Sequence, residues 1–282
     1  MKRRYFVFDA EKCIGCFNCL HACKDEHVGT GFLPVSLPQK LHRQYWLSTK
    51  ETVRGRFPMI DVAYLTEPCG HCENAPCIAS GKGAVIKRDD GVVLIDPERA
   101  KTAGDLSGSC PFGKISFNEE HGVSQKCTFC AHLLDEGREQ PRCVQSCPLG
   151  ALTTEYSEPG STEKRILSGE LARLGELYVS CGSALLIKNI HRLNTLFIGG
   201  KVLAPVGGAD SCLESCSVTL SQNGTALQNI TTDAYGEYKF DRLLPGEYTV
   251  SFQKEGFSPG SVTVRAEESI YAGSYTLKRE TQ

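Results

Sequence analysis

The segment Cys13-Ile14-Gly15-Cys16-Phe17-Asn18-Cys19-Leu20-His21-Ala22-Cys23 decides how the first half of this chain folds. Its four cysteines have the spacing C-x2-C-x2-C-x3-C. Three thiolates spaced three residues apart, on a loop wrapped around a cubane, can each reach a different iron atom of one [4Fe–4S] cluster. The fourth cysteine leaves that loop on a helix and points toward a neighbouring cluster. The segment therefore predicts an iron–sulfur domain that holds more than one cluster.

The other cysteines extend this pattern. Of the fifteen cysteines, twelve lie between Cys13 and Cys147. The later groups are Cys69-x2-Cys72-x4-Cys77, a lone Cys110 before Pro111, Cys127-x2-Cys130, and Cys143-x3-Cys147 before Pro148. The compact first group is the signature of bacterial ferredoxins, in which the fourth cysteine of one motif completes the cluster of its partner motif. Three cysteines lie outside any such group, namely Cys181, Cys212 and Cys216.

Two other uses of paired cysteines compete with this interpretation. Zinc sites also contain C-x2-C pairs, but a zinc ion takes four ligands, usually as two separated pairs, and does not need three thiols within one short loop. A disulfide framework is typical of small secreted proteins, and the pairs here are too close and too repetitive for one. An iron–sulfur domain is the interpretation that uses all the groups together.

Length and charge exclude several other classes of protein. The 282 residues suffice for one large domain or two ordinary ones, and the net charge of −2 lacks the basic surplus of a nucleic-acid-binding protein. The basic residues of Met1 to Arg4 are followed by an apolar run that spans only Tyr5 to Phe8. This run is too short for a signal peptide and predicts a first strand instead. No segment approaches the roughly 18 apolar residues of a membrane helix. We therefore expect a soluble, cytoplasmic chain with no direct membrane insertion, unless a partner with a twin-arginine signal exports it.

With these motifs, residues 1–155 resemble the four-motif iron–sulfur subunits of the dimethyl sulfoxide reductase class of molybdopterin enzymes. In that family, motif one pairs with motif four and motif two with motif three, and each pair builds two clusters. For this chain the resemblance implies three [4Fe–4S] clusters. The implied ligands are Cys13, Cys16, Cys19 and Cys147 for the first cluster, Cys23, Cys127, Cys130 and Cys143 for the second, and Cys69, Cys72, Cys77 and Cys110 for the third.

The family pattern also contains a fourth cluster that this chain lacks. Motif two would have its fourth cysteine at Gly81, and motif three would have its first three at Ala100, Ala103 and Leu106. These four positions are the ligands of a single cluster. All four cysteines are missing together, whereas the other twelve positions keep theirs, so the resemblance implies that one cluster has been removed cleanly.

Two segments between the motifs carry further expectations. Short apolar runs at residues 83–86 and 92–96 flank Asp89-Asp90-Gly91 and predict a β-hairpin, as found beside the cluster loops of ferredoxin halves. Residues 24–68 form an insertion longer than a bare ferredoxin needs. Its aromatic and basic residues either face a partner subunit or belong to a solvated loop with one packed tryptophan. These residues are His42, Arg43, Tyr45, Trp46, Arg54 and Arg56.

The C-terminal part of the chain has a different composition. Residues 156–195 predict a linker with a loop at residues 157–162 and a helix over Glu163 to Leu177. Residues 196–282 predict an antiparallel β-sandwich of about seven short strands, separated by turns such as Asn223-Gly224 and Pro245-Gly246. The strands that show the pattern best are Ser217 to Leu220, Glu237 to Phe240, Glu247 to Phe252 and Ser261 to Arg265.

This second domain resembles the carboxypeptidase-regulatory-like and Cna-B-like sandwiches, on residues 233–240 and 243–250. We expect a packing or docking module without catalysis. Cys212 and Cys216 could form a disulfide or bind a metal, although two reduced thiols are favoured in a reducing compartment, and Cys181 is expected to be a plain small residue. The predicted fold class is an α+β ferredoxin-like double [4Fe–4S] domain followed by an all-β, Ig-like or Cna-B-like sandwich.

A three-cluster domain followed by such a sandwich resembles the small iron–sulfur subunits of the pyrogallol–phloroglucinol transhydroxylase type, and residues 68–77 and 126–135 carry this resemblance further. It implies a heterodimer, or a higher assembly, with a large catalytic subunit that carries a bis-molybdopterin-guanine-dinucleotide molybdenum centre. That enzyme would act on polyhydroxylated aromatic rings in anaerobic metabolism, by transhydroxylation, catechol dehydroxylation or resorcinol hydroxylation. This chain would transfer electrons and hold no catalytic residue, and cations such as Lys12 or Lys126 would make nearby clusters easier to reduce.

Three alternatives stay open. The chain could serve another molybdopterin reductase that acts on oxyanions or on S- or N-oxides, although such subunits usually keep four clusters. It could be a stand-alone polyferredoxin with a binding domain. It could also be a zinc-bound scaffold without a redox role, which assays of iron and acid-labile sulfide would distinguish.

Overall fold

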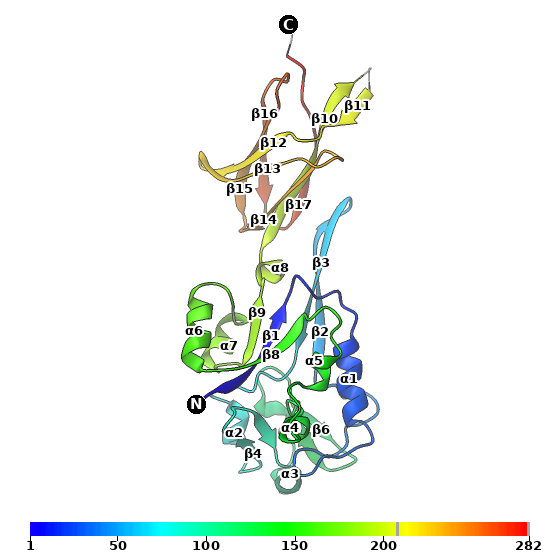
Figure 1. Cartoon of the computed structure of the whole chain (residues 1–282), viewed down its shortest axis with the longest axis vertical. Coiled ribbons are helices and arrows are strands. Elements are labelled where there is room, and N and C mark those ends of the chain that lie inside the picture. Colours follow the sequence, from blue (N-terminus) through cyan, green and yellow to red (C-terminus); the bar gives the residue numbers. More distant parts are fainter. Residues whose placement is uncertain (207–208, 281–282) are drawn as a thin grey trace. The chain divides into compact units, whose positions relative to one another are not determined.

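The computed structural model describes residues 1–206 and 209–280, which form two compact units (Figure 1). The first unit comprises Met1–Glu51 and Ala63–Ile190, and the second comprises Thr52–Val62 and His191–Gln282. Strands outweigh helices among the described residues, and the helices are short. None of the helices in the described part of the chain has the length and apolar character needed to span a bilayer.

A three-stranded sheet in the order β8-β1-β9 lies beside the cysteine loops of the first unit. Its strands are β1 (Arg3–Asp9), β8 (Leu152–Ser157) and β9 (Leu185–Lys188). Successive side chains of a strand point to opposite faces of the sheet. On one face Tyr5 and Val7 pack with Leu171, while Phe6 contacts the ring of Phe129 at 4.1 Å between centroids. The strand expected at the start of the chain is confirmed, and it has the cysteine loops on one side.

Short helices and hairpins carry those loops. The helices are α1 (Asn18–His27), α2 (Pro76–Ser80), α3 (Pro97–Ala103), the 3-10 turn η1 (Ser107–Ser109), α4 (Ala131–Asp135) and α5 (Arg142–Gln145). The hairpins pair β2 (Ser48–Arg56) with β3 (Met59–Glu67), β4 (Val85–Lys87) with β5 (Val93–Ile95), and β6 (Ser116–Asn118) with β7 (Val123–Gln125). The hairpin predicted around Asp89-Asp90-Gly91 is confirmed as β4 and β5, with Val85 opposite Ile95.

Two separate helices, α6 (Pro159–Leu167) and α7 (Gly175–Ser180), replace the single helix predicted over Glu163 to Leu177. The predicted extent was wrong at both ends. Pro159 occupies the first helical turn, where its missing N–H costs nothing. Gly169 has a φ of +78° and ends α6, because the N–H of Glu170 then donates to the carbonyl oxygen of Arg165 at 3.1 Å. Beyond α7 the chain enters β9, so the segment expected to be a linker adds a strand to the sheet of the first unit.

The second unit is a β-sandwich. After the short helix α8 (His191–Asn194), one sheet contains β10 (Leu196–Val206), β11 (Ala209–Cys212), β14 (Glu237–Leu243) and β17 (Ile270–Thr276). The other has the order β13-β12-β15-β16, with β12 (Ser217–Gln222), β13 (Thr225–Thr231), β15 (Gly246–Gln253) and β16 (Gly260–Ala266). The expected alternation is confirmed in β15, where Tyr248, Val250 and Phe252 are buried in the shared core. The described residues contain eight strands here, against about seven predicted.

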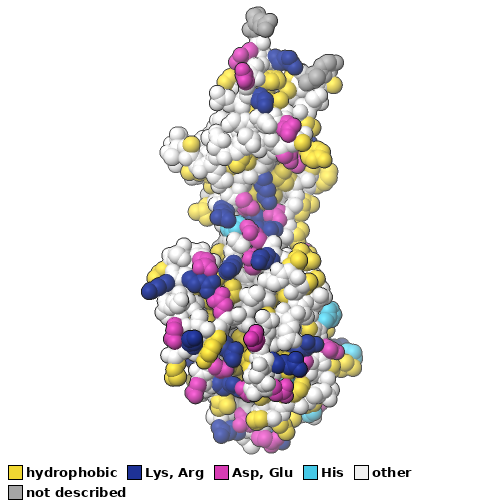
Figure 2. Space-filling view, in the orientation of Figure 1, with side chains coloured by type: hydrophobic (Ala, Val, Ile, Leu, Met, Phe, Trp, Pro, Cys, Tyr) yellow, Lys and Arg dark blue, Asp and Glu magenta, His cyan; other side chains and the backbone are white. Residues whose placement is uncertain are grey.

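The residues singled out in the insertion divide into internal and exposed ones. Trp46 is buried, with its ring 4.5 Å from that of His27. Arg54 is buried in the second unit and pairs with Asp61 and Asp241. The exposed members are His42, Arg43, Tyr45 and Arg56. The tryptophan and one arginine therefore stabilise the chain itself, and only the exposed members remain available to a partner. Figure 2 shows basic and acidic side chains interspersed on the visible face of the first unit.

Candidate iron–sulfur sites

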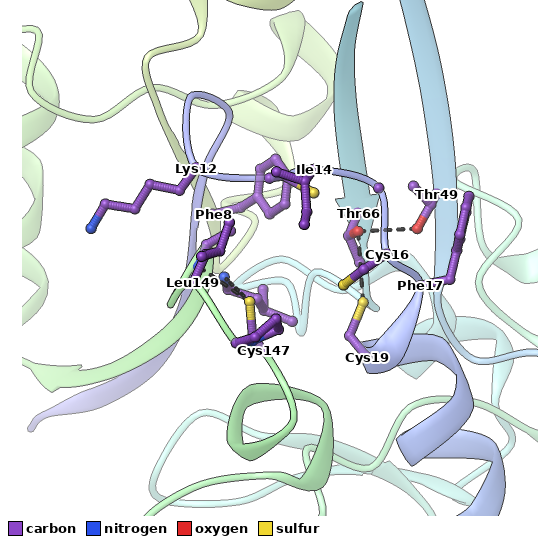
Figure 3. Close-up of a pocket in the computed structure, with 15 residues that line it drawn as sticks. Phe8, Lys12, Ile14, Cys16, Phe17, Cys19, Thr49, Thr66, Cys147 and Leu149 are labelled. Carbon is purple, nitrogen blue, oxygen red and sulfur yellow. Dashed lines mark hydrogen bonds between the residues drawn. The ribbon is translucent and has the colours of Figure 1, made fainter.

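The first cysteine site consists of Cys13, Cys16, Cys19 and Cys147, whose side chains line one cavity. Figure 3 shows Cys16, Cys19 and Cys147 projecting toward the same space, whereas the side chain of Lys12 points away from it. Gly15 has a φ of +68°, and a Cβ there would lie 2.5 Å from the ring of Tyr64. The loop that spaces these cysteines therefore requires a glycine at this position.

Hydrogen-bond donors already surround sulfurs of the first site. The backbone N–H groups of Ala151 and Leu152 donate to Cys147 Sγ at 3.2 and 3.4 Å. The hydroxyl of Thr66 lies 3.9 Å from Cys19 Sγ. Hydrogen bonds to cluster sulfurs are one of the means by which a protein sets a cluster's reduction potential.

The third cysteine site consists of Cys69, Cys72, Cys77 and Cys110, which line a second cavity. The backbone N–H of His71 donates to Cys69 Sγ, and that of Lys114 donates to Cys110 Sγ, both at 3.4 Å. Cys110 is the only cysteine on its segment and lies directly after η1, far in sequence from the other three. The structure thus brings together the four residues that the family pattern implied for the third cluster.

The second cysteine site consists of Cys23, Cys127, Cys130 and Cys143, all of which are buried. Apart from burial, the pKa of Cys23 is raised by the charges of Cys127 and Cys130, and that of Cys143 by Cys130, Cys23 and Cys127. The four thiol groups therefore lie within range of one another's charge. A ring nitrogen of His27 lies 3.8 Å from Cys130 Sγ. The fold therefore brings the cysteines of each implied set near one another.

Burial favours the protonated form of the most buried of these thiols. Burial, with smaller effects from the charges of other cysteines, raises the pKa of Cys72 and of Cys130 from 9 to about 12 and that of Cys127 to about 11. A thiolate is the form that binds metal, so these sites need bound positive charge. Among the residues that the structure describes, no three Cys, His, Asp or Glu side chains converge on a point suited to a single ion. The sulfurs of the first and third sites surround cavities instead, which fits a polynuclear cluster.

The three sites are adjacent to one another. Helix α1 places Cys19 at the first site and Cys23 at the second, one helical turn further along. Between the second and third sites, the backbone N–H of Cys69 hydrogen-bonds to Cys127 and lowers its pKa against the effect of burial. The ammonium of Lys126 lies 3.6 Å from Cys69 Sγ. The order is therefore first, second and third site, with the second in the middle.

The four positions of the missing cluster are filled by apolar packing. Ala100, Ala103 and Leu106 are buried in one hydrophobic cluster, which we call the apolar fill. Its other buried members are Cys77, Ala84, Val85, Val93, Ile95, Ile115 and Val123. A Cβ at Gly81 would lie 2.4 Å from a methyl group of Val85 and 2.8 Å from the carbonyl oxygen of Cys77. Closely packed atoms therefore surround all four positions.

Sequence reasoning gave no role to several residues near the sites. His71 lies beside a sulfur of the third site, and His27 lies beside a sulfur of the second. The position of His71 inside the motif Cys69-Gly70-His71-Cys72 could have indicated its place near the third site. Cys181 is buried, and its charge is one of the causes that raise the pKa of Cys72, after burial and Cys69. In the second unit Cys216 is buried and Cys212 is exposed, and neither is in a disulfide.

Comparisons with known proteins agree with this architecture. Residues 60–156 match the family model of the 4Fe-4S dicluster domain, and residues 198–277 match that of the carboxypeptidase regulatory-like domain. The predicted order of an iron–sulfur domain and a carboxypeptidase-regulatory-like sandwich is therefore confirmed.

Three relatives extend the comparison. The chain is 36% identical to the pyrogallol hydroxytransferase small subunit of Pelobacter acidigallici, over 98% of this chain and 100% of that one. It is 32% identical to a putative dimethyl sulfoxide reductase iron–sulfur subunit of Halobacterium salinarum, over 51% of this chain and 63% of that one. It is 29% identical to the thiosulfate reductase electron transfer subunit PhsB of Salmonella typhi, over 66% and 93%. The chain belongs to the iron–sulfur electron-transfer subunits of molybdopterin oxidoreductases, in the family that includes the pyrogallol hydroxytransferase small subunit.

Proposed function

We propose that this chain holds three [4Fe–4S] clusters and passes electrons to or from a large molybdenum subunit that acts on polyhydroxylated aromatic rings. The clusters would transfer single electrons. The chain would supply the thiolate ligands, the hydrogen bonds to their sulfurs and the burial that limits contact with solvent. The twelve ligands are the members of the first, second and third cysteine sites. We propose no catalytic residue in this chain. The observation that supports the proposal best is that four cysteines line each of two cavities, while the four cysteines proposed for the second site are buried together.

The match over the full length supports the aromatic branch of the family. The relatives named for dimethyl sulfoxide and thiosulfate reductases match 51% and 66% of this chain, whereas the pyrogallol hydroxytransferase small subunit matches 98% of it, second unit included. The apolar fill supports the count of three clusters. We therefore assign the partner a bis-molybdopterin-guanine-dinucleotide molybdenum centre and propose a heterodimer as its smallest assembly.

Domain organisation and compartment belong to the same proposal. We propose a ferredoxin-like double domain over residues 1–155 and a docking or packing sandwich over residues 196–282. Residues 156–195 connect the two in sequence, and up to Ile190 they belong to the first unit. Thiolate ligands persist best in a reducing compartment, so we place the complex in the cytoplasm. A partner with a twin-arginine signal would carry it across the membrane instead.

The rim of the first site supports a place for the partner to dock. Cys16 is exposed, in contrast to the buried sulfurs of the second site. Around it the exposed fractions are 62% for Ile14, 43% for Phe17 and 49% for Leu149. Exposed apolar side chains grouped around a functional cavity mark interaction surfaces. We propose that the molybdenum subunit covers this rim, which brings its own redox group nearest to the first site.

Metal analysis tests the cluster count. We expect about twelve iron and twelve acid-labile sulfide per chain after anaerobic purification, because three [4Fe–4S] clusters contain that number. About sixteen of each would overturn the three-cluster count, and zinc without sulfide would overturn the redox function altogether.

Co-purification with the large subunit tests the docking rim. We expect Ile14→Asp to reduce recovery of the complex at least tenfold, because the substitution puts a charge into an apolar interface. Leu167→Asp is the matched control, since Leu167 is 82% exposed on α6 and lies outside the rim. Equal loss in both variants, or in neither, would contradict docking at this rim. A stable chain that never associates with a molybdenum subunit would favour a stand-alone polyferredoxin.

A further inference from the structure

Lys126 is a buried lysine between two of the cysteine sites. It directly precedes Cys127 of the second site, and only 3% of it is exposed. Its ammonium lies 3.6 Å from Cys69 Sγ of the third site and 3.0 Å from the carbonyl oxygen of Cys127. It also donates to the carbonyl oxygen of Val93 in β5. The side chain therefore bridges the second and third sites.

Among the residues that the structure describes, the partners of the Lys126 ammonium include no carboxylate. An ammonium has three donors, and all three are accounted for by two carbonyl oxygens and one sulfur. Burying an ion without an opposite charge is strongly unfavourable. The negative charge that balances Lys126 must then come from the cysteine thiolates and the iron–sulfur group that they bind.

The other cations close to the sites differ in this respect. Arg3 is also buried, but it pairs with Glu73 at 3.1 Å. Lys114 lies near Cys110, but its charge interacts with that of Glu67. Lys12 directly precedes Cys13 just as Lys126 precedes Cys127, but it is exposed, and solvent screens it. Lys24 interacts with the charge of Cys23, but it is only partly buried, and its ammonium donates to the carbonyl oxygens of Lys40 and Gln44 rather than to a sulfur. Of these cations, Lys126 is the one that is buried against a cysteine sulfur without a carboxylate beside it.

We infer that Lys126 is a positioning residue for electron transfer: its unpaired ammonium stabilises the extra electron on the third cluster and makes that cluster easier to reduce. This inference rests on the proposed function, because it assumes a cluster at Cys69, Cys72, Cys77 and Cys110. A positive charge beside a cluster favours the reduced state, which carries one more negative charge. The third cluster lies furthest from the docking rim, so Lys126 favours storage of an electron at that end of the chain.

Reduction potentials of the clusters test this role. We expect Lys126→Met to lower the reduction equilibrium constant of the third cluster at least tenfold, which is 59 mV for a one-electron couple, in a titration followed by electron paramagnetic resonance. Lys126→Arg keeps the charge and should stay within threefold of the wild type. Lys12→Met is the matched control, with less than a twofold effect on the third cluster.

Several results would overturn the inference. An unchanged potential of the third cluster in Lys126→Met with full iron content would do so, as would an equal shift at all three clusters. If Lys126→Met does not incorporate its clusters, Lys126→Gln and Lys126→Arg are compared instead. Glutamine removes the charge and arginine keeps it, so the comparison distinguishes an effect of the charge from an effect of packing. If Lys126→Arg lowers the potential as much as Lys126→Gln, the field effect is refuted. The proposed function fails separately, through the iron and sulfide content of the wild-type chain.

Discussion

Replacing Cys110 with serine removes one [4Fe–4S] cluster and leaves the other two in place. Cys110 is the only ligand that its segment offers to the third site, and the remaining three cysteines cannot complete the four thiolates of a cubane. We expect iron to fall from about twelve to about eight per chain, with the loss of one of three signals in electron paramagnetic resonance. The second site shares no ligand with the third, so its signal should remain.

The control for this experiment is Cys181→Ser. Cys181 is buried and close enough to Cys72 to raise its pKa, yet it is outside the proposed ligand sets. Serine at this position should leave about twelve iron per chain. Loss of a cluster in Cys181→Ser, with none lost in Cys110→Ser, would exchange the roles of these two cysteines. Loss of two signals in Cys110→Ser would refute the pairing of ligands proposed here.

Shortening Leu106 to alanine should lower the stability of the chain by about 2–5 kcal/mol without changing its iron content. Leu106 is 4% exposed and belongs to the apolar fill, so the substitution leaves a cavity that its neighbours close only in part. The midpoint of urea unfolding, measured anaerobically with the clusters loaded, should fall accordingly. The iron content should stay at about twelve, because no ligand has been touched.

Leu167→Ala provides the comparison for this variant. Leu167 is 82% exposed at the end of α6, and removing an exposed side chain usually changes stability by less than about 0.5 kcal/mol. Similar midpoints for the two variants would mean that Leu106 is not part of a packed core. Iron lost from Leu106→Ala would mean that the apolar fill also supports the third site.

Cysteine spacing and the resemblance predicted most of the first unit. The motif from Cys13 to Cys23 predicted a loop followed by a helix, and the structure has α1 beginning at Asn18. The hairpin around Gly91 could also be predicted from the sequence, because a turn signal lies between two short apolar runs. The alternation in Tyr248 to Phe252 predicted a half-buried strand of the sandwich. In each case the signal is local in the sequence.

Features that depend on contacts between residues far apart in the sequence could not be predicted from the sequence. β9 has a short apolar sequence, and only its pairing with β1, near the other end of the first unit's sequence, makes it part of that unit. Lys126 was named as a cation near a cluster, but its position between two sites depends on Val93 and Cys69, which come from other segments. His27 beside Cys130 is a similar case, because a single histidine at the end of a helix carries no distinctive spacing.

The apolar fill makes the loss of the fourth cluster hard to reverse one mutation at a time. A single cysteine at Ala100 or Ala103 would add volume to a packed core and supply one ligand of the four that a cubane needs. A cysteine at Gly81 would collide with Val85 and with the backbone at Cys77. Each single substitution therefore lowers stability without allowing a fourth cluster to bind. All four substitutions together would also require β4 to move. The packing therefore opposes each single substitution that would lead from the proposed three clusters to four.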